Sequence, residues 1–383
     1  MKPDFDALRR EFPVLQHKTY LNSGSYCALA RPVKAAFETY LEDRLAIGSS
    51  WDLWTAKNES VRALTAQLLG ASPDEIAVTA SVSAGLNSLA SALDFSGARN
   101  KVVISDFEFP TNAQIWHAQE PRGAQVVHVH RDASGYIPAE RFADAIDERT
   151  QLVAITHVCF RNGAKLDIPG IVRIARAKGA KVLLDCYQSV GSMELNVKTL
   201  DVDFAVGGML KYLLGTAGIG FMYVRDAFTQ SLVPTNSGWF AQADIAAMDI
   251  SANTPAPNAR RFEAGTPAVV NCYAAEAGLK LLLEVGTPNI EKRVYALTRR
   301  CMERLVEIGW PSITPTEDSR RGANVCVPSR DPAGLCAEMA KRNIVTSYRD
   351  NNLRAMFHFY NNDDDIEAFI TAMQSLRGSF APN

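Results

Sequence analysis

Two residues of the sequence have side chains suited to chemistry on an amine or a carbonyl group. Asp185 ends the apolar run KVLLD, and Lys211 follows the run FAVGG within the Gly-studded stretch GGMLKYLLGTAGIGFMYVR. Lys211 lies between Leu210 and Tyr212, an apolar setting for an amine that ordinarily faces water. Burial lowers the pKa of an amine and makes it a nucleophile toward carbonyl groups, as a Schiff-base lysine requires. A capping aspartate and a lysine at a sheet edge are the simpler interpretations of each residue alone.

A third candidate is the loop TASVSAGLNSLA at 79–90, which lies between the apolar run EIAV and a helical pattern. The N–H groups at a helix N-terminus attract anions, and Ser81 and Ser83 add hydroxyl donors. The loop therefore predicts an anion site, while a serine that only caps the helix is the simpler interpretation.

Other motifs that carry chemistry are incomplete. GTAGIG (215–220) lacks the GxGxxG order of a dinucleotide-binding loop, and SVSAG (81–85) lacks the first glycine of the GxSxG nucleophile turn. The sequence has no GxxxxGK[ST]. His128 and His130 would share one side of a strand without a further ligand, so no metal site is expected.

Alternating apolar and amphipathic segments between about 75 and 225 predict the elements that position these residues. The apolar runs are rich in Val and Ile, as in strands covered on both faces, and helical patterns separate them. Such alternation predicts an α/β domain with a mostly parallel sheet. Open sheets of this kind bind ligands at the carboxyl ends of their strands, where all three candidates lie. The runs are EIAVTA (75–80), KVVIS (101–105), AQVVHVH (124–130), QLVAITHV (151–158), AKVLLDC (180–186), FAVGG (204–208) and IGFMYVR (219–225).

The composition argues against several classes of protein. The chain has 383 residues, with 40 Lys and Arg against 42 Asp and Glu, so no broad attraction to nucleic acid or to a membrane surface is expected. No segment reaches the roughly 18 apolar residues of a membrane span, and the N-terminal residues lack the apolar stretch of a signal peptide. Seven dispersed cysteines without a CxxC pair favour a reducing compartment. We expect a soluble, cytoplasmic protein.

Two domains are expected from the length and from a change of pattern near residue 260. A large α/β domain would span residues 18–258. Residues 259–383 would form a smaller α+β domain that includes a long apolar helix at an interface, and residues 1–17 would lie near it.

Taken together, these features resemble fold type I enzymes that depend on pyridoxal phosphate, and specifically the class V aminotransferase family. This family also contains cysteine desulfurases, isopenicillin-N epimerase-like proteins and kynureninase. The resemblance implies a large domain with a mostly parallel sheet covered by helices and a smaller α+β C-terminal domain. It extends from YLNSGSY (20–26) to FHFYNNDDDIEAF (357–369). Its motifs follow the order of the family: the loop at 79–90, EFPTN (108–112), LLDCYQSVG (183–191), the GGMLKYLL stretch, RFEAGTP (261–267) and LRAMFHFYN (353–361).

The resemblance implies that four residues hold the ring of pyridoxal phosphate. Lys211 would bind the cofactor covalently as a Schiff base, and Asp185 would pair with the pyridine nitrogen. Gln188 would hydrogen-bond the phenolic oxygen, and Phe109 would stack on the ring face. The chemistry agrees with these roles, since a cationic ring needs a carboxylate at its nitrogen.

The same resemblance implies how the cofactor's phosphate is held. Ser81, Val82 and Ser83 would bind it through backbone N–H and hydroxyl groups. Thr266 would reach it from the neighbouring subunit, which implies a homodimer with shared active sites.

The resemblance also implies a small amino acid as the substrate. Arg354 would bind the α-carboxylate through a bidentate contact, and Asn22 would lie near the substrate. The pocket for the side chain of the substrate could include Arg161, Arg349 and Trp239. A surface ion pair for each arginine and core packing for the tryptophan are equally open interpretations.

Amino transfer is the expected reaction, and several alternatives stay open. They are β-elimination by a C–S lyase-like enzyme, kynureninase-type hydrolysis, epimerisation, and a regulatory protein that binds the cofactor without turnover. Desulfurases of the family carry a nucleophilic cysteine on a mobile loop. Here Cys326 lies in a predicted strand and Cys336 in a predicted helix, so sulfur relay through a persulfide is not expected.

Overall fold

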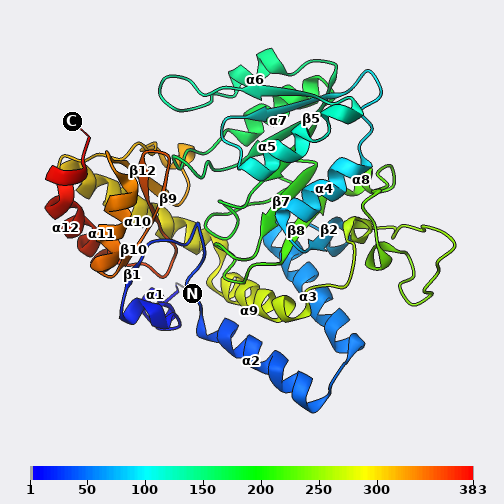
Figure 1. The fold of residues 1–383 in the computed structure, drawn as a ribbon, viewed down its shortest axis with the longest axis horizontal. Helices are drawn as coiled ribbons and strands as arrows, with labels where there is room; N and C mark the ends of the chain where they lie inside the picture. The colour runs from blue at the N-terminus through cyan, green and yellow to red at the C-terminus, as the bar shows by residue number, and fades with distance from the viewer. Residues whose placement is uncertain (1–2, 383) are drawn as a thin grey trace.

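The computed structural model describes residues 3–382 and shows a large lobe built on one seven-stranded sheet (Figure 1). The strands are β2 (Ile76–Thr79), β3 (Lys101–Ser105), β4 (Gln125–Val129), β5 (Thr150–Thr156), β6 (Lys181–Asp185), β7 (Phe204–Gly208) and β8 (Gly220–Val224). Their order is β2-β8-β7-β6-β5-β3-β4, and β8 alone runs antiparallel to its neighbours. The predicted α/β class with a mostly parallel sheet is therefore confirmed.

Helices cover both faces of this sheet and build most of the second lobe. They are α1 (Phe5–Arg9), α2 (Arg31–Ala46), α3 (Trp51–Leu69), α4 (Val82–Ala92), α5 (Pro110–His117), α6 (Glu140–Ala145), α7 (Ile168–Ala177), α8 (Asp226–Thr229), α9 (Val269–Val285), α10 (Thr287–Glu307), α11 (Pro332–Lys341) and α12 (Asp363–Phe380). Single-turn 3₁₀ helices are η1 (Pro13–Gln16), η2 (Pro73–Glu75), η3 (Glu120–Arg122), η4 (Trp239–Ala241), η5 (Ala259–Phe262) and η6 (Asp318–Arg320). None of the helices within residues 3–382 is long and apolar enough to cross a membrane.

The two faces of the sheet are buried because successive side chains of a strand point to opposite sides. In β5, Leu152 and Ala154 belong to the apolar cluster that includes residues of α4 and α5. Val153 and Ile155 belong to the cluster on the other face, with residues of α3, α7 and α9. The apolar runs of the sequence therefore form strands that are covered twice.

The smaller lobe contains a three-stranded antiparallel sheet of order β11-β12-β9 and its own apolar cluster. Its strands are β9 (Asn324–Pro328), β10 (Ile344–Val345), β11 (Ser347–Arg349) and β12 (Asn352–Met356). The N-terminal segment joins this lobe, because β1 (Thr19–Tyr20) pairs in parallel with β10. Arg9 also forms a 2.7 Å ion pair with the buried Asp365 of α12.

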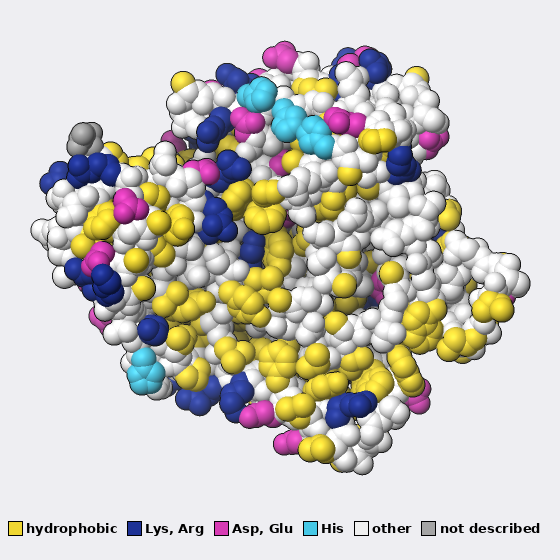
Figure 2. Space-filling model, viewed as in Figure 1, with side chains coloured by type: hydrophobic (Ala, Val, Ile, Leu, Met, Phe, Trp, Pro, Cys, Tyr) yellow, Lys and Arg dark blue, Asp and Glu magenta, His cyan; other side chains and the backbone are white. Residues whose placement is uncertain are grey.

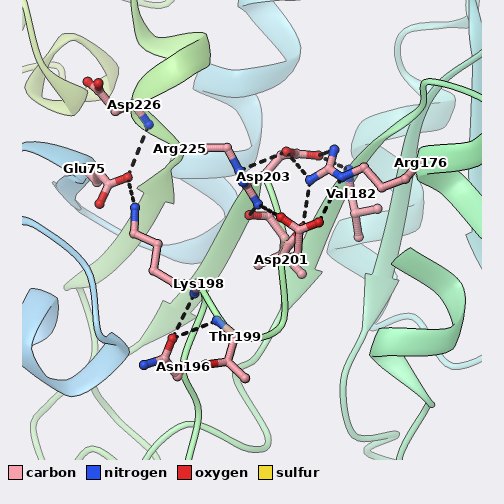
Figure 3. Close-up of polar contacts among 11 residues, drawn as sticks. Glu75, Arg176, Val182, Asn196, Lys198, Thr199, Asp201, Asp203, Arg225 and Asp226 are labelled. Carbon is pink, nitrogen blue, oxygen red and sulfur yellow. Dashed lines mark hydrogen bonds and ion pairs between the residues drawn. The ribbon is translucent and has the colours of Figure 1, made fainter. Parts of the chain in front are cut away.

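A buried carboxylate fixes the amino-terminal edge of the large sheet (Figure 3). Asp203, directly before β7, has no exposed surface. It accepts hydrogen bonds of 2.8 and 2.7 Å from Arg176 and of 2.8 Å from the backbone N–H of Val182. Arg225 Nε lies 3.2 Å from the same carboxylate. One side chain thus joins α7, β6 and the end of β8, on the opposite edge from the candidate residues.

Candidate active site

The carboxyl ends of β5, β6 and β7 bring the main candidates to one edge of the sheet. Asp185 is the last residue of β6, and Lys211 follows β7 by three residues. Because the three strands are parallel and adjacent, the segments that leave them meet at this edge.

The amine of Lys211 lies against aromatic rings. Its Nζ is 4.1 Å from the ring centre of Tyr187 and 5.7 Å from that of Phe109. Burial lowers the pKa of Lys211 to about 8, the charge of Asp185 opposes this shift, and Arg354 and Arg349 add to it. At neutral pH most of the amine therefore stays protonated, but its neutral, nucleophilic fraction is far larger than that of an ordinary lysine.

The loop that carries Lys211 is held in a strained conformation. Leu214 has a φ of 60°, a left-handed conformation that costs a non-glycine residue about 1–2 kcal/mol. Gly278 of α9 lets this loop approach closely, since a Cβ there would lie 2.6 Å from a backbone oxygen of the loop. The N–H of Cys27 donates a 3.0 Å hydrogen bond to Leu210 O. Contacts from two distant segments thus hold the lysine in place.

Asp185 is buried, with an exposed fraction of 4%, and its Oδ1 accepts a 3.0 Å hydrogen bond from the N–H of Tyr187. Burial raises the pKa of this carboxyl group, while the Tyr187 hydrogen bond and the charge of Lys211 lower it. A cationic partner at its other oxygen would favour the ionised form.

Two buried polar atoms without partners lie close to each other beside Gly24. Gln188 Nε2 donates a 2.9 Å hydrogen bond to Gly24 O, but Gln188 Oε1 and the hydroxyl of Tyr212 are buried without a partner. A Cβ at Gly24 would lie 2.8 Å from Gln188 Oε1 and 2.7 Å from the Tyr212 hydroxyl. Buried polar atoms are nearly always satisfied, so these two atoms point to a polar ligand.

The N-terminus of α4 has the form of an anion site. Ser81 is the N-cap, and its Oγ accepts a 3.1 Å hydrogen bond from the N–H of Ala84. The N–H groups of Val82 and Ser83 belong to the first turn and have no acceptor within the helix. Ser83 Oγ shares a 2.8 Å hydrogen bond with the hydroxyl of Thr111.

Thr266 lies beside the same helix end within the chain. It lines a cavity of about 100 Å³ together with Thr79, Ala80, Ala84 and Gly265. Thr266 is exposed, so a neighbouring molecule can also reach it.

Phe109 directly precedes α5 and is 43% exposed. Its ring meets the ring of Phe160 edge to face, with 5.1 Å between the ring centres. The ring of Phe109 thus borders the space around Lys211, and Phe160 packs behind it.

Arg354 is buried and lacks an acidic partner among residues 3–382. It donates hydrogen bonds of 2.9 Å to Phe160 O, 3.2 Å to Ser25 Oγ and 2.9 Å to Ser347 Oγ. Its Nε is buried without a partner, and burial lowers the pKa of the guanidinium group. A buried cation that contacts only neutral oxygens is suited to bind an anion.

Asn22 lies near Arg354 through the backbone, because it forms a bridge with Met356 of β12. Its Oδ1 is buried without a partner. Trp239 lies elsewhere and packs against Trp51 and Phe240, with ring centres 5.6 and 4.5 Å away. Among the described residues no group of three His, Cys, Asp or Glu side chains could hold a metal ion.

Several residues of the site were missed at the level of the sequence. They are Gly24, Ser25, Tyr187, Tyr212 and Ser347. The two tyrosines could have been found by their position in the sequence, since Tyr187 lies between Asp185 and Gln188 and Tyr212 directly follows Lys211. The remaining three become neighbours of the site only through the packing of the two lobes.

The fold and this arrangement define a fold type I enzyme that depends on pyridoxal phosphate. The orphaned atoms of Gln188 and Tyr212, the open oxygen of Asp185 and the N-terminus of α4 suit the ring and phosphate of that cofactor. The chain belongs to the class-V aminotransferase family, whose model matches residues 36–369.

Individual relatives carry several different activities in their names. The chain is 33% identical over 358 residues to the "Uncharacterized aminotransferase YcbU" of Bacillus subtilis, covering 94% of each chain. It is 31% identical over 358 residues to a kynureninase of Deinococcus radiodurans, covering 89% of this chain and 85% of the relative. The structure of an apo cysteine desulfurase from Thermococcus onnurineus superimposes with a TM-score of 0.88 at 25% identity, covering 98% of both chains.

Proposed function

We propose that the protein is an aminotransferase that takes the amino group from a small α-amino acid. The observation that carries this proposal is the amine of Lys211, which has a pKa of about 8 and no hydrogen-bond partner among the described side chains. Such an amine can bind an aldehyde and can move a proton at the α-carbon of a substrate. The name of the Bacillus subtilis relative agrees with this reaction.

The residues of the large lobe would hold pyridoxal phosphate, which supplies an aldehyde for amines and a ring that accepts electrons from the α-carbon. Asp185 would keep a proton on the pyridine nitrogen, and Gln188 would bind the phenolic oxygen. Phe109 would stack on the ring, and Ser81, Val82 and Ser83 would bind the phosphate.

Arg354 would orient the substrate through its α-carboxylate. Its Nη atoms already donate to Ser25, Ser347 and the backbone of residue 160, so the guanidinium group is held in place before the substrate binds. A bound carboxylate would supply the negative charge that these neutral oxygens lack. Asn22 Oδ1 would accept a hydrogen bond from the substrate.

The protein would act as a homodimer in which Thr266 reaches the phosphate of the partner subunit. Exposed apolar side chains of α2 and the start of α3 support a covered surface, notably Leu45 at 89%, Leu41 at 59%, Ile47 at 57% and Trp51 at 47% exposed. Figure 2 shows hydrophobic side chains gathered over this part of the molecule. The seven unpaired thiols support a reducing, cytoplasmic setting.

A second candidate is a lyase or hydrolase of the kynureninase or C–S lyase kind. The identity of 31% to a kynureninase favours it. Sulfur relay has less support: six of the seven cysteines are buried, and Cys336 is half-buried with its thiol 3.5 Å from Thr346 O. Epimerisation and cofactor binding without turnover use the same residues and remain outcomes of the test.

One experiment separates these reactions. The holoenzyme is mixed with single amino acids, without an added keto acid, and the cofactor, ammonia and keto acid are followed. Amino transfer predicts stoichiometric conversion of the cofactor to its amine form without ammonia. Continuous release of ammonia indicates an eliminating lyase, and alanine formed from kynurenine without ammonia indicates kynureninase-type hydrolysis. Inverted substrate without any of these products indicates an epimerase, and no spectral change with any amino acid contradicts turnover altogether.

A further inference from the structure

We infer that the substrate is an amino acid with a second acidic group, and that Arg349 binds this group. The inference rests on the proposed function, because it names the substrate class of the same site. It follows from the position of Arg349 relative to Arg354 and from the lack of acidic partners for both residues within the described range 3–382.

Arg349 and Arg354 lie on the same face of the β11–β12 pair. In this antiparallel pair Ser347 is opposite Arg354, and Arg349 is opposite Asn352. Side chains two residues apart on a strand share a face, so Arg349 lies on the face of Ser347 and hence of Arg354. Diagonal neighbours of this kind are about 7–8 Å apart, within the reach of two long side chains that bind one ligand.

Positive charge exceeds negative charge in this region. Arg161, which follows β5, is 3.5 Å from Asp350, and its Nε is buried without a partner. Among the residues that the structure describes, Arg349 donates only to Tyr348 O, at 3.1 Å, and Arg354 contacts only neutral oxygens. Within residues 3–382 Asp350 is the one carboxylate paired with any of these three arginines. The α-carboxylate of a substrate would neutralise Arg354 and leave Arg349 without a counter-ion.

The remaining charge acts on the reactive amine. Burial is the largest cause of the lowered pKa of Lys211, and the charges of Arg354 and Arg349 lower this pKa further. The charge of Arg349 also lowers the pKa of Arg354. An anionic group bound between the arginines would reduce this repulsion. Figure 2 shows Lys and Arg side chains in the hollow between the lobe of α10–α12 and the lobe of the large sheet.

The chemistry of Arg349 defines the group it would bind. A guanidinium group presents paired N–H donors in a plane and matches a carboxylate or a sulfinate by two parallel hydrogen bonds. Arg349 is exposed to solvent, whereas Arg354 is buried. The acidic group of the side chain would therefore lie toward solvent, and the α-carboxylate would lie in the protein interior. Amino acids with a carboxylate or sulfinate on a short side chain fit this arrangement.

The test compares acidic amino acids with their uncharged isosteres. Dissociation constants for L-aspartate, L-glutamate and L-cysteine sulfinate are measured from the visible spectrum of the holoenzyme, against L-asparagine, L-glutamine and L-alanine. We expect the acids to bind at least about 10-fold more tightly than their amides. Arg349→Gln should raise the dissociation constants of the acids by about 10- to 100-fold, which removes this preference, and should leave the dissociation constants of the amides unchanged. Arg349→Lys, which keeps the charge and loses the fork, should retain part of the preference.

A second readout does not depend on turnover. Calorimetry of the holoenzyme with succinate and with butyrate should show tighter binding of succinate, and Arg349→Gln should remove the difference. The matched control is Arg173→Gln, an exposed arginine of α7 on the other lobe, which should change neither measurement.

Two results would overturn the inference. One is an enzyme that reacts with neutral amino acids and binds acids and amides, or succinate and butyrate, equally. The other is an Arg349→Gln protein, folded as judged by circular dichroism, that loses affinity for acids and amides alike. If no amino acid changes the spectrum, the proposed function fails, while the succinate comparison still decides the role of Arg349.

Discussion

The guanidinium group of Arg354 donates a 2.9 Å hydrogen bond to the backbone oxygen of Phe160, and the two residues belong to different lobes. Arg354 lies on β12 of the small sheet, and Phe160 follows β5 of the large sheet. The proposed carboxylate-binding residue is thus positioned by the lobe that carries Lys211 and Asp185. Substrate binding and the contact between the lobes therefore depend on the same side chain.

Arg354→Gln should weaken substrate binding and leave the cofactor attached. The loss of a charge-assisted bidentate contact predicts a rise in the KM for the amino acid of about 10- to 100-fold. Steady-state kinetics and the visible absorbance of the holoenzyme provide the two measurements. Release of the cofactor from the variant would contradict the assignment of Arg354 to the carboxylate.

Attachment of pyridoxal phosphate to the apoprotein should depend on pH through Lys211. Because its pKa is about 8, the rate should rise as the pH approaches 8 and level off above it, as the amine loses its proton. An ordinary lysine, with a pKa of about 10.4, would keep the rate rising to about pH 10. Borohydride should fix the cofactor on a peptide that contains Lys211, and Lys211→Arg should abolish this product.

Asp185→Asn should have two separable effects. A neutral amide cannot keep a proton on the pyridine nitrogen, so turnover with any amino acid should fall by about 10²–10³-fold. Since the charge of Asp185 raises the pKa of Lys211, the pH at which attachment levels off should also move downward. Stopped-flow spectra of the half-reaction test the first effect, and near wild-type turnover would rule out the pairing with the ring nitrogen.

The proposed dimer can be broken at α2. Leu45 is 89% exposed, and an aspartate there should prevent a partner from covering it. Sedimentation equilibrium should report a dimer for the natural protein and a monomer for Leu45→Asp. If Thr266 acts on the partner's phosphate, the monomer should also bind the cofactor more weakly. Val306→Asp, at a 63% exposed position on α10, is the control, and a natural protein that sediments as a monomer would refute the proposal.

Asp203→Asn tests the stability of the sheet independently of the site. The carboxylate is fully buried and holds Arg176, Arg225 and the N–H of Val182 (Figure 3). Both arginines are partly exposed, so we expect a loss of about 2–4 kcal/mol in the free energy of unfolding rather than the full cost of a buried ion pair. Denaturant unfolding measures it. Glu148→Gln, at an exposed pair with Lys178, should change stability by less than about 0.5 kcal/mol.

The strands of the large sheet could be predicted because their signal is local. Apolar runs such as KVLLD predict covered strands, and the parallel arrangement then places Asp185 and the segment of Lys211 at one edge. The helix start at Ser81 also had a local signal, whereas the family resemblance added Arg354, whose geometry was not predictable. The position of Phe160 against Arg354 had no local signal, because the two residues are 194 positions apart in the chain.

The sequence by itself determined the fold class, the family and which residue types carry chemistry, since these depend on hydrophobic patterning and on short motifs. Only the tertiary structure brought Gly24 to Gln188 and Tyr212. It alone placed Arg349 on the face of Arg354, with no acidic partner for either residue in the described part of the chain. These relationships arise when the two lobes pack and when β11 pairs with β12 in one particular register. A contact between distant segments depends on the whole packed chain, which no short stretch of sequence specifies.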